Sequence, residues 1–265
     1  MQIYSHRIGT ALIWLGKGLR IFAKQWAKFL SLFMALTFGF GILAILPDFL
    51  LLIVSVLSIP IIQMVLFNAS HGTAIRGHFL LSDLPKKLQT PSVWLRLLIA
   101  ALLNTLVIYF IMQITFPSLP LSTEQLESMS SMQMAQYMAE HMSIFSLFPG
   151  FALISLYLLF TAWVFPLLSW ESMSLGKAYA YSFKATLSNL LPLVFLCILL
   201  FCIMLCLILF PQYVALYFIQ DISIFYLLIF IAVNTAVVII HTCQYASYIG
   251  MFFEPEQKEP TQEIP

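Results

Sequence analysis

Residues Phe29 to Phe67, FLSLFMALTFGFGILAILPDFLLLIVSVLSIPIIQMVLF, form a long apolar run in which Asp48 is the only charged residue. A helix crosses the hydrocarbon core of a bilayer with roughly 20 residues, so a run of this length must turn back once. Pro47 and Asp48 mark that turn, since proline does not continue a helix and an unpaired carboxylate belongs at the membrane interface. The stretch therefore predicts two membrane spans, 29–46 and 49–68.

The composition of the whole chain agrees with a lipid environment. Hydrophobic residues make up 62% of the sequence and charged residues 9%, and the mean hydropathy is +0.98, which lies outside the range of soluble globular domains. The same reasoning about apolar runs predicts four more spans, 93–116, 145–168, 190–210 and 222–250. We therefore expect an all-α integral membrane protein with six transmembrane helices, formed by one polytopic domain (1–253) and a disordered cytoplasmic tail (254–265).

The distribution of basic residues predicts the orientation. With six spans, every lysine and arginine falls on one side, and the opposite loops carry acidic residues only. The positive-inside rule then places both termini in the cytoplasm of a bacterial cell, with the protein in the inner membrane. Because 28 residues rich in base precede the first span and no small-residue cleavage pattern follows it, no cleavable signal peptide is expected.

The segment between spans four and five predicts an amphipathic helix that lies in the cytoplasmic interface. Lys177, Tyr181, Lys184 and Ser188 recur at helical spacing on one face, and an apolar face carries Leu175, Tyr179, Phe183 and Leu187. Ser174 stands where an N-cap is expected, Asn189 where the helix ends, and Pro192 in the first turn of span five. We call this segment, residues 174–189, the elbow. Its predicted lipid-facing residues are Lys177, Tyr179, Tyr181, Phe183, Lys184 and Asn189.

The N-terminal 28 residues repeat this pattern. Ile8, Leu12, Leu15, Leu19, Phe22 and Trp26 form an apolar stripe, and the tripeptide LGK at 15–17 recurs at 175–177. A weaker copy, SDLPKKLQTPSVWLR, precedes span three at 82–96. Three repeated units, each an interfacial basic helix followed by a hairpin of two spans, and a chance similarity both remain open.

Nearly the whole chain resembles a family of uncharacterised six-helix inner-membrane proteins of proteobacteria. The resemblance rests on the basic segment GKGLRIFAKQW, the proline-bearing AWVFPLL of span four, the elbow SLGKAYAYSFKATLSNLLP and a short polar tail. Gln25-Trp26 departs from the usual Asn-Pro stop of that family, and the loop between spans three and four is longer than expected. The resemblance implies a fold and a location, and no activity.

Two groups of residues raise the question of metal binding. The cysteines, Cys197, Cys202, Cys206 and Cys243, all fall inside predicted spans, where small apolar filler is the favoured reading and a metal or redox pair of Cys202 with Cys206 the alternative. The outer loop 117–144 carries methionines and His141. This pattern suits an amphipathic helix that rests on the membrane, and the alternative is a Cu(I) site, because Cu(I) prefers soft ligands. We expect no metal or other cofactor.

The spans contain neutral polar residues but no acid or base near the bilayer centre, which disfavours proton-coupled transport and intramembrane hydrolysis. Such residues most often hydrogen-bond neighbouring helices. If the protein is a transporter, they are instead the candidate lining of a polar path: Gln63, Asn104, Gln113, Asn234 and His241.

The sequence contains no HExxH, GxSxG, P-loop or dinucleotide-binding pattern, so we expect no enzymatic activity. The favoured function is a scaffold, accessory or membrane-homeostasis role, and the alternatives are a small-solute or lipid transporter and an outer-face copper-binding protein. The expected partners are the lipid bilayer and anionic headgroups on the cytoplasmic side, with a homo-oligomer or a membrane-protein partner left open. No nucleic-acid partner is expected.

Overall fold

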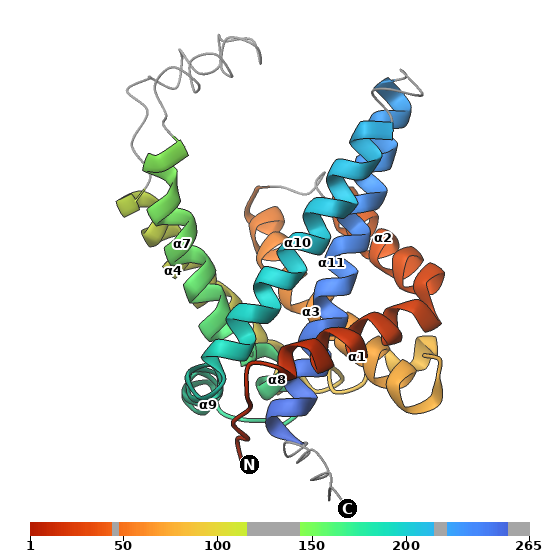
Figure 1. Cartoon of the computed structure of the whole chain (residues 1–265). Helices are drawn as coiled ribbons and strands as arrows, with labels where there is room; N and C mark the ends of the chain where they lie inside the picture. The colour runs from red at the N-terminus through yellow and green to blue at the C-terminus, as the bar shows by residue number, and fades with distance from the viewer. Residues whose placement is uncertain (44–47, 116–143, 215–221, 254–265) are drawn as a thin grey trace, which may run out of the picture.

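The computed structural model describes residues 1–43, 48–115, 144–214 and 222–253 (Figure 1). The turn at Pro47, almost all of the methionine-bearing outer loop, and the C-terminal tail lie outside these ranges. Every secondary-structure element within the described ranges is helical, which confirms the predicted all-α class.

Within the described residues, four helices are long and apolar enough to cross a membrane, or up to five if the bent pair formed by α1 and α2 counts as one span. The helices that coincide with the six predicted span segments are α2 (Trp26–Ile42), α3 (Asp48–Arg76), α4 (Pro91–Thr115), α7 (Ile144–Thr161) with α8 (Val164–Ser169), α10 (Leu190–Val214) and α11 (Ile222–Phe252).

Two shorter helices stand at the junctions where sequence predicted interfacial helices. Helix α1 (Thr10–Lys24) meets α2 at Gln25 with a bend of 85°. Helix α9 (Leu175–Ser188) meets α10 at Asn189, whose φ of −128° and ψ of 28° resemble the −143° and 33° of Gln25. The segment predicted as a third copy contains instead the 3₁₀ turn η2 (Leu81–Asp83) and further turns before α4 begins at Pro91.

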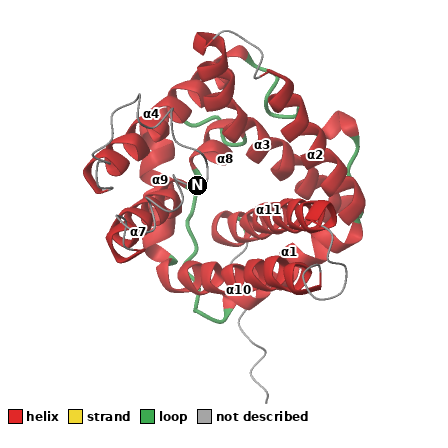
Figure 2. Cartoon of the chain, turned by 90° about the horizontal axis from the view of Figure 1, so that it is seen from above, coloured by secondary structure: helices red, strands yellow, loops and turns green. Residues whose placement is uncertain are grey.

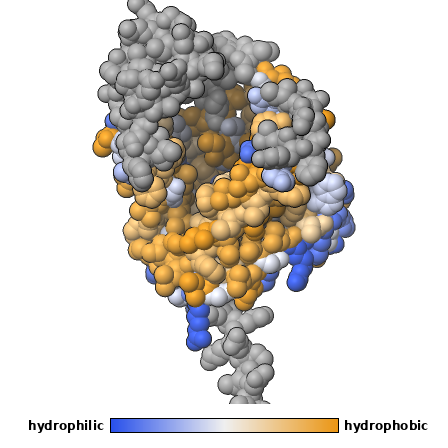
Figure 3. Space-filling model, turned by 45° about the horizontal axis from the view of Figure 1, so that its top comes forward, coloured by the Kyte–Doolittle hydropathy of each residue, from blue (hydrophilic) through white to orange (hydrophobic). Residues whose placement is uncertain are grey.

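The helices converge at one end of the molecule and separate towards the other (Figures 1 and 2). We call the converging end the basal end; it contains α1, α8, α9, the start of α4, and the C-terminal ends of α3 and α11. At the opposite, distal end, α4 and α7 form one arm, and α10 and α11 form another. Apolar residues cover much of the visible surface of the molecule (Figure 3).

The buried residues follow this division. On α4 they are Val93, Leu97, Ala100, Ala101 and Asn104, all between the basal end and the middle turn of the helix. On α10 they are Pro192, Leu193 and Leu196, again next to the basal end. The core therefore occupies the basal end, and the apolar side chains of the distal arms face outward, as they do in a lipid solvent.

Close approach of α1 to α11 depends on glycine. A Cβ atom placed on Gly18 would overlap Cys243 of α11, and one on Gly250 would overlap the ring of Trp14. Helix α1 buries Ala11, Trp14, Gly18 and Ile21 against the bundle. The predicted apolar stripe is therefore only partly turned inward: its members Leu15 and Phe22 are half-buried against the core, whereas Ile8, Leu12 and Trp26 are exposed.

Candidate functional site

The break in span four brings together polar side chains of several helices. Pro166 lacks an N–H, so it leaves the carbonyl of Ala162, four residues earlier, without its helical partner. Helix α7 ends at Thr161 and α8 begins at Val164. Gln63 of α3 and Gln244 of α11 each donate a hydrogen bond from Nε2 to the Ala162 oxygen, at 3.1 and 2.9 Å.

The elbow helix α9 completes the same break. Ser182 donates to the Phe160 carbonyl at 2.6 Å and accepts from the Trp163 N–H at 3.3 Å. Thr186 donates to the Leu159 carbonyl at 3.1 Å. Sequence reasoning did not assign a role to Ser182 or Thr186. The signal that could have found them is Pro166, which predicts unpaired carbonyls upstream and hence nearby hydroxyl or amide donors.

Asn104 joins three helices. Its Oδ1 accepts hydrogen bonds from the hydroxyls of Tyr157 on α7 and Tyr179 on α9, both at 2.7 Å. The Tyr179 hydroxyl also lies 3.3 Å from the carbonyl of Ala100. Asn104 therefore ties α4 to the elbow and to span four.

The other candidate path residues do not join Asn104. Asn234 and His241 bind carbonyls of their own helix, Phe230 at 2.6 Å and Val237 at 2.8 Å. Gln113 is exposed near the end of α4. Within the described structure, no hydrogen bond connects any two of Gln63, Asn104, Gln113, Asn234 and His241, so these residues do not form one hydrogen-bonded network.

The elbow presents three surfaces rather than two. Ala178, Ser182, Ala185 and Thr186 are buried against the protein. Phe183 and Leu187, each 51% exposed, share one part of the remaining surface, and Lys177 and Lys184 are exposed beside them. Tyr179 and Tyr181 are half-buried, so Tyr179 packs towards α4 instead of sharing the exposed surface of Phe183. Ser174 occupies the N-cap position without a hydrogen bond from its side chain.

Asn189 ends the elbow helix, as predicted, and also clamps the N-terminus of the chain. Its side chain is fully buried; Oδ1 accepts from the His6 N–H at 2.9 Å, and Nδ2 donates to the carbonyls of Tyr4 at 2.9 Å and Ala185 at 3.1 Å. The Tyr4 N–H donates to the Met251 carbonyl at 2.9 Å. Residues 4–6 thus bridge the elbow and the end of α11.

An aromatic cluster that sequence reasoning missed lies at the basal end. The Trp170 ring packs edge-on to Phe67, His71 and Tyr248, with centroid distances of 6.1, 5.0 and 5.8 Å. Trp170 Nε1 donates to Asn68 Oδ1 at 2.9 Å, and His71 Nδ1 lies 3.0 Å from the Tyr245 hydroxyl. The regular spacing of Tyr245 and Tyr248 on one face of α11 could have indicated it.

The loop after α3 is held by a carboxylate. Asp83, buried at 3% exposure, pairs with Arg76 and with Lys86 Nζ at 2.6 Å, and it accepts from the Leu80 N–H at 2.9 Å. The Lys86 hydrogen bond, the Leu80 N–H and the charge of Arg76 lower the pKa of Asp83 to about 2. Asn68 fixes the same loop by donating to the carbonyls of Leu84 and Lys86 at 2.8 and 2.7 Å.

Histidine, cysteine, aspartate and glutamate side chains do not cluster in threes as a metal site anywhere in the described ranges. Cys197, Cys202 and Cys206 are exposed on α10, and Cys243 is buried against α1. The methionines of the outer loop and His141 lie outside the described residues.

No family model, no curated protein and no solved structure matches this chain. The resemblance to six-helix inner-membrane proteins of proteobacteria therefore stays a prediction. Within the described residues, the structure supports a helical protein with several helices that could cross a membrane.

Proposed function

We propose that this chain is a multi-pass protein of the bacterial inner membrane with a scaffold, accessory or membrane-homeostasis role and no catalytic activity of its own. In this proposal all six predicted segments cross the membrane and both termini are cytoplasmic. Support for the six spans comes from the coincidence of each segment with a helix. Support for the orientation comes from the confinement of lysine and arginine to one set of loops.

The observation that carries the scaffold role is the use of the polar side chains. Gln63 and Gln244 both donate hydrogen bonds to the Ala162 carbonyl. Asn104 accepts hydrogen bonds from two tyrosine hydroxyls. Groups paired in this way hold helices together and are not available to replace the hydration shell of a moving solute. The pairing of these side chains favours a role in helix packing over a role in the passage of a solute.

The second candidate function is transport of a small solute or a lipid. The observation that favours it is an apolar groove between α7 and α10, with a volume of about 370 Å³. A transporter needs a route between the two leaflets or the two aqueous phases, and a groove open to the bilayer is one form of such a route for a lipid.

Reconstitution into liposomes tests the two functions against each other. Vesicles that carry a fluorescent phospholipid in both leaflets are exposed to dithionite, which bleaches only the outer leaflet. We expect the same bleached fraction with and without the protein, and the same osmotic swelling in a series of small neutral solutes. Faster or more complete bleaching, or selective swelling, would establish transport and refute the scaffold role.

Reporter fusions test the topology. Fusions after Lys87 and after Lys258 should report the cytoplasm, and a fusion near Ser130 should report the outer side. A cytoplasmic signal near Ser130 would remove the six-span arrangement together with the argument from basic residues.

We also propose that α1 with α2 and α9 with α10 are related units. Both have a short helix, a bend at a polar residue with similar backbone angles, and a long apolar helix. Superposing the bends pairs Gly18 with Ser182, whereas superposing the two LGK tripeptides pairs Gly18 with Ala178. The two alignments differ by about one helical turn, so the LGK identity by itself does not support the repeat.

A further inference from the structure

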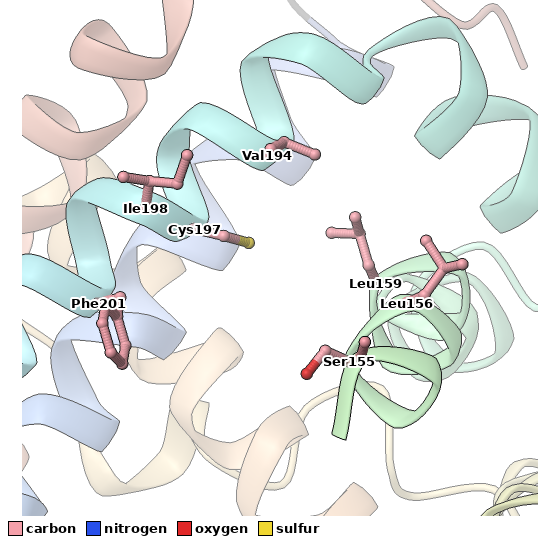
Figure 4. Close-up of a pocket in the computed structure, with 8 residues that line it drawn as sticks. Ser155, Leu156, Leu159, Val194, Cys197, Ile198 and Phe201 are labelled. Carbon is pink, nitrogen blue, oxygen red and sulfur yellow. The ribbon is translucent and has the colours of Figure 1, made fainter. Parts of the chain in front are cut away.

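The groove between α7 and α10 has walls that are almost entirely apolar. It is lined from α7 by Ala152, Ser155, Leu156 and Leu159, and from α10 by Val194, Cys197, Ile198 and Phe201. Cys197 points from α10 towards the α7 wall (Figure 4). The volume of the groove, about 370 Å³, lies within the range of roughly 300–1,000 Å³ that is typical of small-ligand sites.

The groove opens sideways because its two walls are joined through a third helix. Helices α7 and α10 each contact the elbow helix α9, but they do not pack along each other. Both walls belong to segments with the hydropathy and length of membrane spans, Phe148–Ser169 and Leu190–Val214. In the proposed membrane placement, the groove therefore faces acyl chains.

The elbow closes the basal end of the groove. Thr186 donates to the carbonyl of Leu159, a residue of the groove wall. The Phe183 ring stacks on Phe160, the next residue of α7, with centroids 4.8 Å apart. At its other end the elbow runs through Asn189 into α10, which carries Val194 one turn further on.

The exposed surface of the elbow is positively charged next to this closed end. Lys184 follows Phe183 directly, and Lys177 lies two turns earlier on the same exposed side. Between residues 174 and 214, which include both the elbow and the α10 wall, the sequence contains these two lysines and no aspartate or glutamate. An anionic group at this level meets complementary charge.

We propose that the groove binds one acyl chain of an anionic phospholipid whose phosphate is held by Lys184 and Lys177. The inference rests on the membrane placement of the proposed function and adds a ligand and a site to it. The acyl chain covers the apolar walls, which are otherwise unpartnered between two separated helices. The headgroup lies beside the elbow, with Phe183 and Leu187 at the boundary between chain and headgroup.

Spin-label spectroscopy in liposomes tests both halves of the proposal. The full chain is reconstituted with phosphatidylglycerol, or with phosphatidylcholine, spin-labelled near the end of one acyl chain. The wild type should immobilise a fraction of the label, with a preference for phosphatidylglycerol. Cys197→Trp, which fills the groove, should reduce the immobilised fraction, and Ser155→Trp should do the same from the α7 wall.

Two control variants separate the site from general effects. Cys206→Trp changes the same residue type on the same helix at an exposed position outside the groove, and it should leave the immobilised fraction unchanged. Lys177→Gln with Lys184→Gln should lower the preference for phosphatidylglycerol roughly fivefold for each lysine. Lys24→Gln with Lys28→Gln, on exposed positions of α1 and α2, should not.

Several outcomes would overturn the proposal. One is an immobilised fraction that neither tryptophan substitution in the groove reduces. Another is a lipid preference that the Lys177 and Lys184 changes do not alter. Absence of immobilised lipid in the wild type, for example because a second copy covers the groove, would also overturn it. Failure of the scaffold role would be seen separately, as lipid bleaching or solute swelling in the vesicle assay.

Discussion

The basal and distal ends of this molecule are built from similar apolar residues but are held in different ways. At the basal end, spans, elbow and N-terminal segment are connected by hydrogen bonds of the buried residues Gln63, Asn104 and Asn189. At the distal end, the side chains of α4 beyond Asn104 are largely exposed, among them Leu106, Tyr109, Phe110 and Ile114. Hydropathy therefore makes a helix stable in lipid, whereas small and polar residues fix helices to one another.

The largest effect should come from the tightest helix contact. Gly18→Leu introduces a side chain where a Cβ would already overlap the Cys243 backbone, so we expect a loss of about 3 kcal/mol in unfolding free energy, the upper part of the range for overpacking. The same change at Gly39, on α2 with nothing within 4 Å of an added Cβ, should be nearly neutral. Unfolding in mixed detergent micelles measures both. Equal losses would contradict the close contact of α1 with α11 at Gly18.

The next effect should come from the clamp on the N-terminus. Asn189→Ala leaves the His6 N–H and the Tyr4 carbonyl without their partner, and unpaired buried groups of this kind cost about 1–3 kcal/mol together with the lost bonds. We expect the unfolding free energy to fall by about 2 kcal/mol. Hydrogen exchange of the N-terminal residues should become faster. Ser188→Ala, at the neighbouring exposed position, is the control. Unchanged exchange at His6 in the Asn189 variant would show that the clamp is not formed.

A smaller effect should follow from loss of one interhelical node. Asn104→Leu removes the acceptor of two tyrosine hydroxyls, and interhelical hydrogen bonds in membranes average about 0.6 kcal/mol each. We therefore expect a loss of about 1 kcal/mol, with Gln113→Leu, on the exposed part of the same helix, unchanged or slightly stabilised. If Gln113→Leu were the more damaging variant, the distal end would have a polar role that packing does not explain.

The smallest and most local effect should be a loss of stability of the 77–90 loop at acidic pH. The folded-state pKa of Asp83 is about 2 and lies below its unfolded value of about 3.9. Its contribution to stability is thus fully present above about pH 4 and is lost as the pH falls through the folded-state pKa. Proteolysis of the 77–90 loop by an acid-active protease should rise between about pH 4 and pH 2. The Asp83→Asn variant should be cleaved already at higher pH, with little further change on acidification.

The order of the helices was accessible from sequence, because a helix in lipid must be apolar over a fixed length. The helix observed at Pro91–Thr115 coincides with the segment predicted at 93–116. The turn of direction at Asn189 was predicted as well, from a polar residue just before an apolar run that carries Pro192 in its first turn. The third copy of the interfacial helix was not found, because Pro85 and Asp83 favour turns there.

The faces by which the helices pack were not accessible in the same way. In water, an apolar stripe indicates the side that turns inward, but in lipid an apolar stripe is equally stable facing outward. Helix α1 accordingly packs through Ala11, Trp14, Gly18 and Ile21, whereas Leu12, of the predicted stripe, is exposed. Whether a glycine lies at a close contact between two helices depends on where the neighbouring helix packs.

By itself, then, the sequence determined that the protein is helical, which segments are apolar enough for a membrane, and where polar residues interrupt them. The folded arrangement of the helices was needed to see that Gln63 and Gln244 bind the Ala162 carbonyl freed by Pro166, and that Asn104 accepts hydrogen bonds from Tyr157 and Tyr179. The physical reason is that hydropathy acts on each residue separately, whereas a hydrogen bond needs a donor and an acceptor that the chain brings together from distant positions.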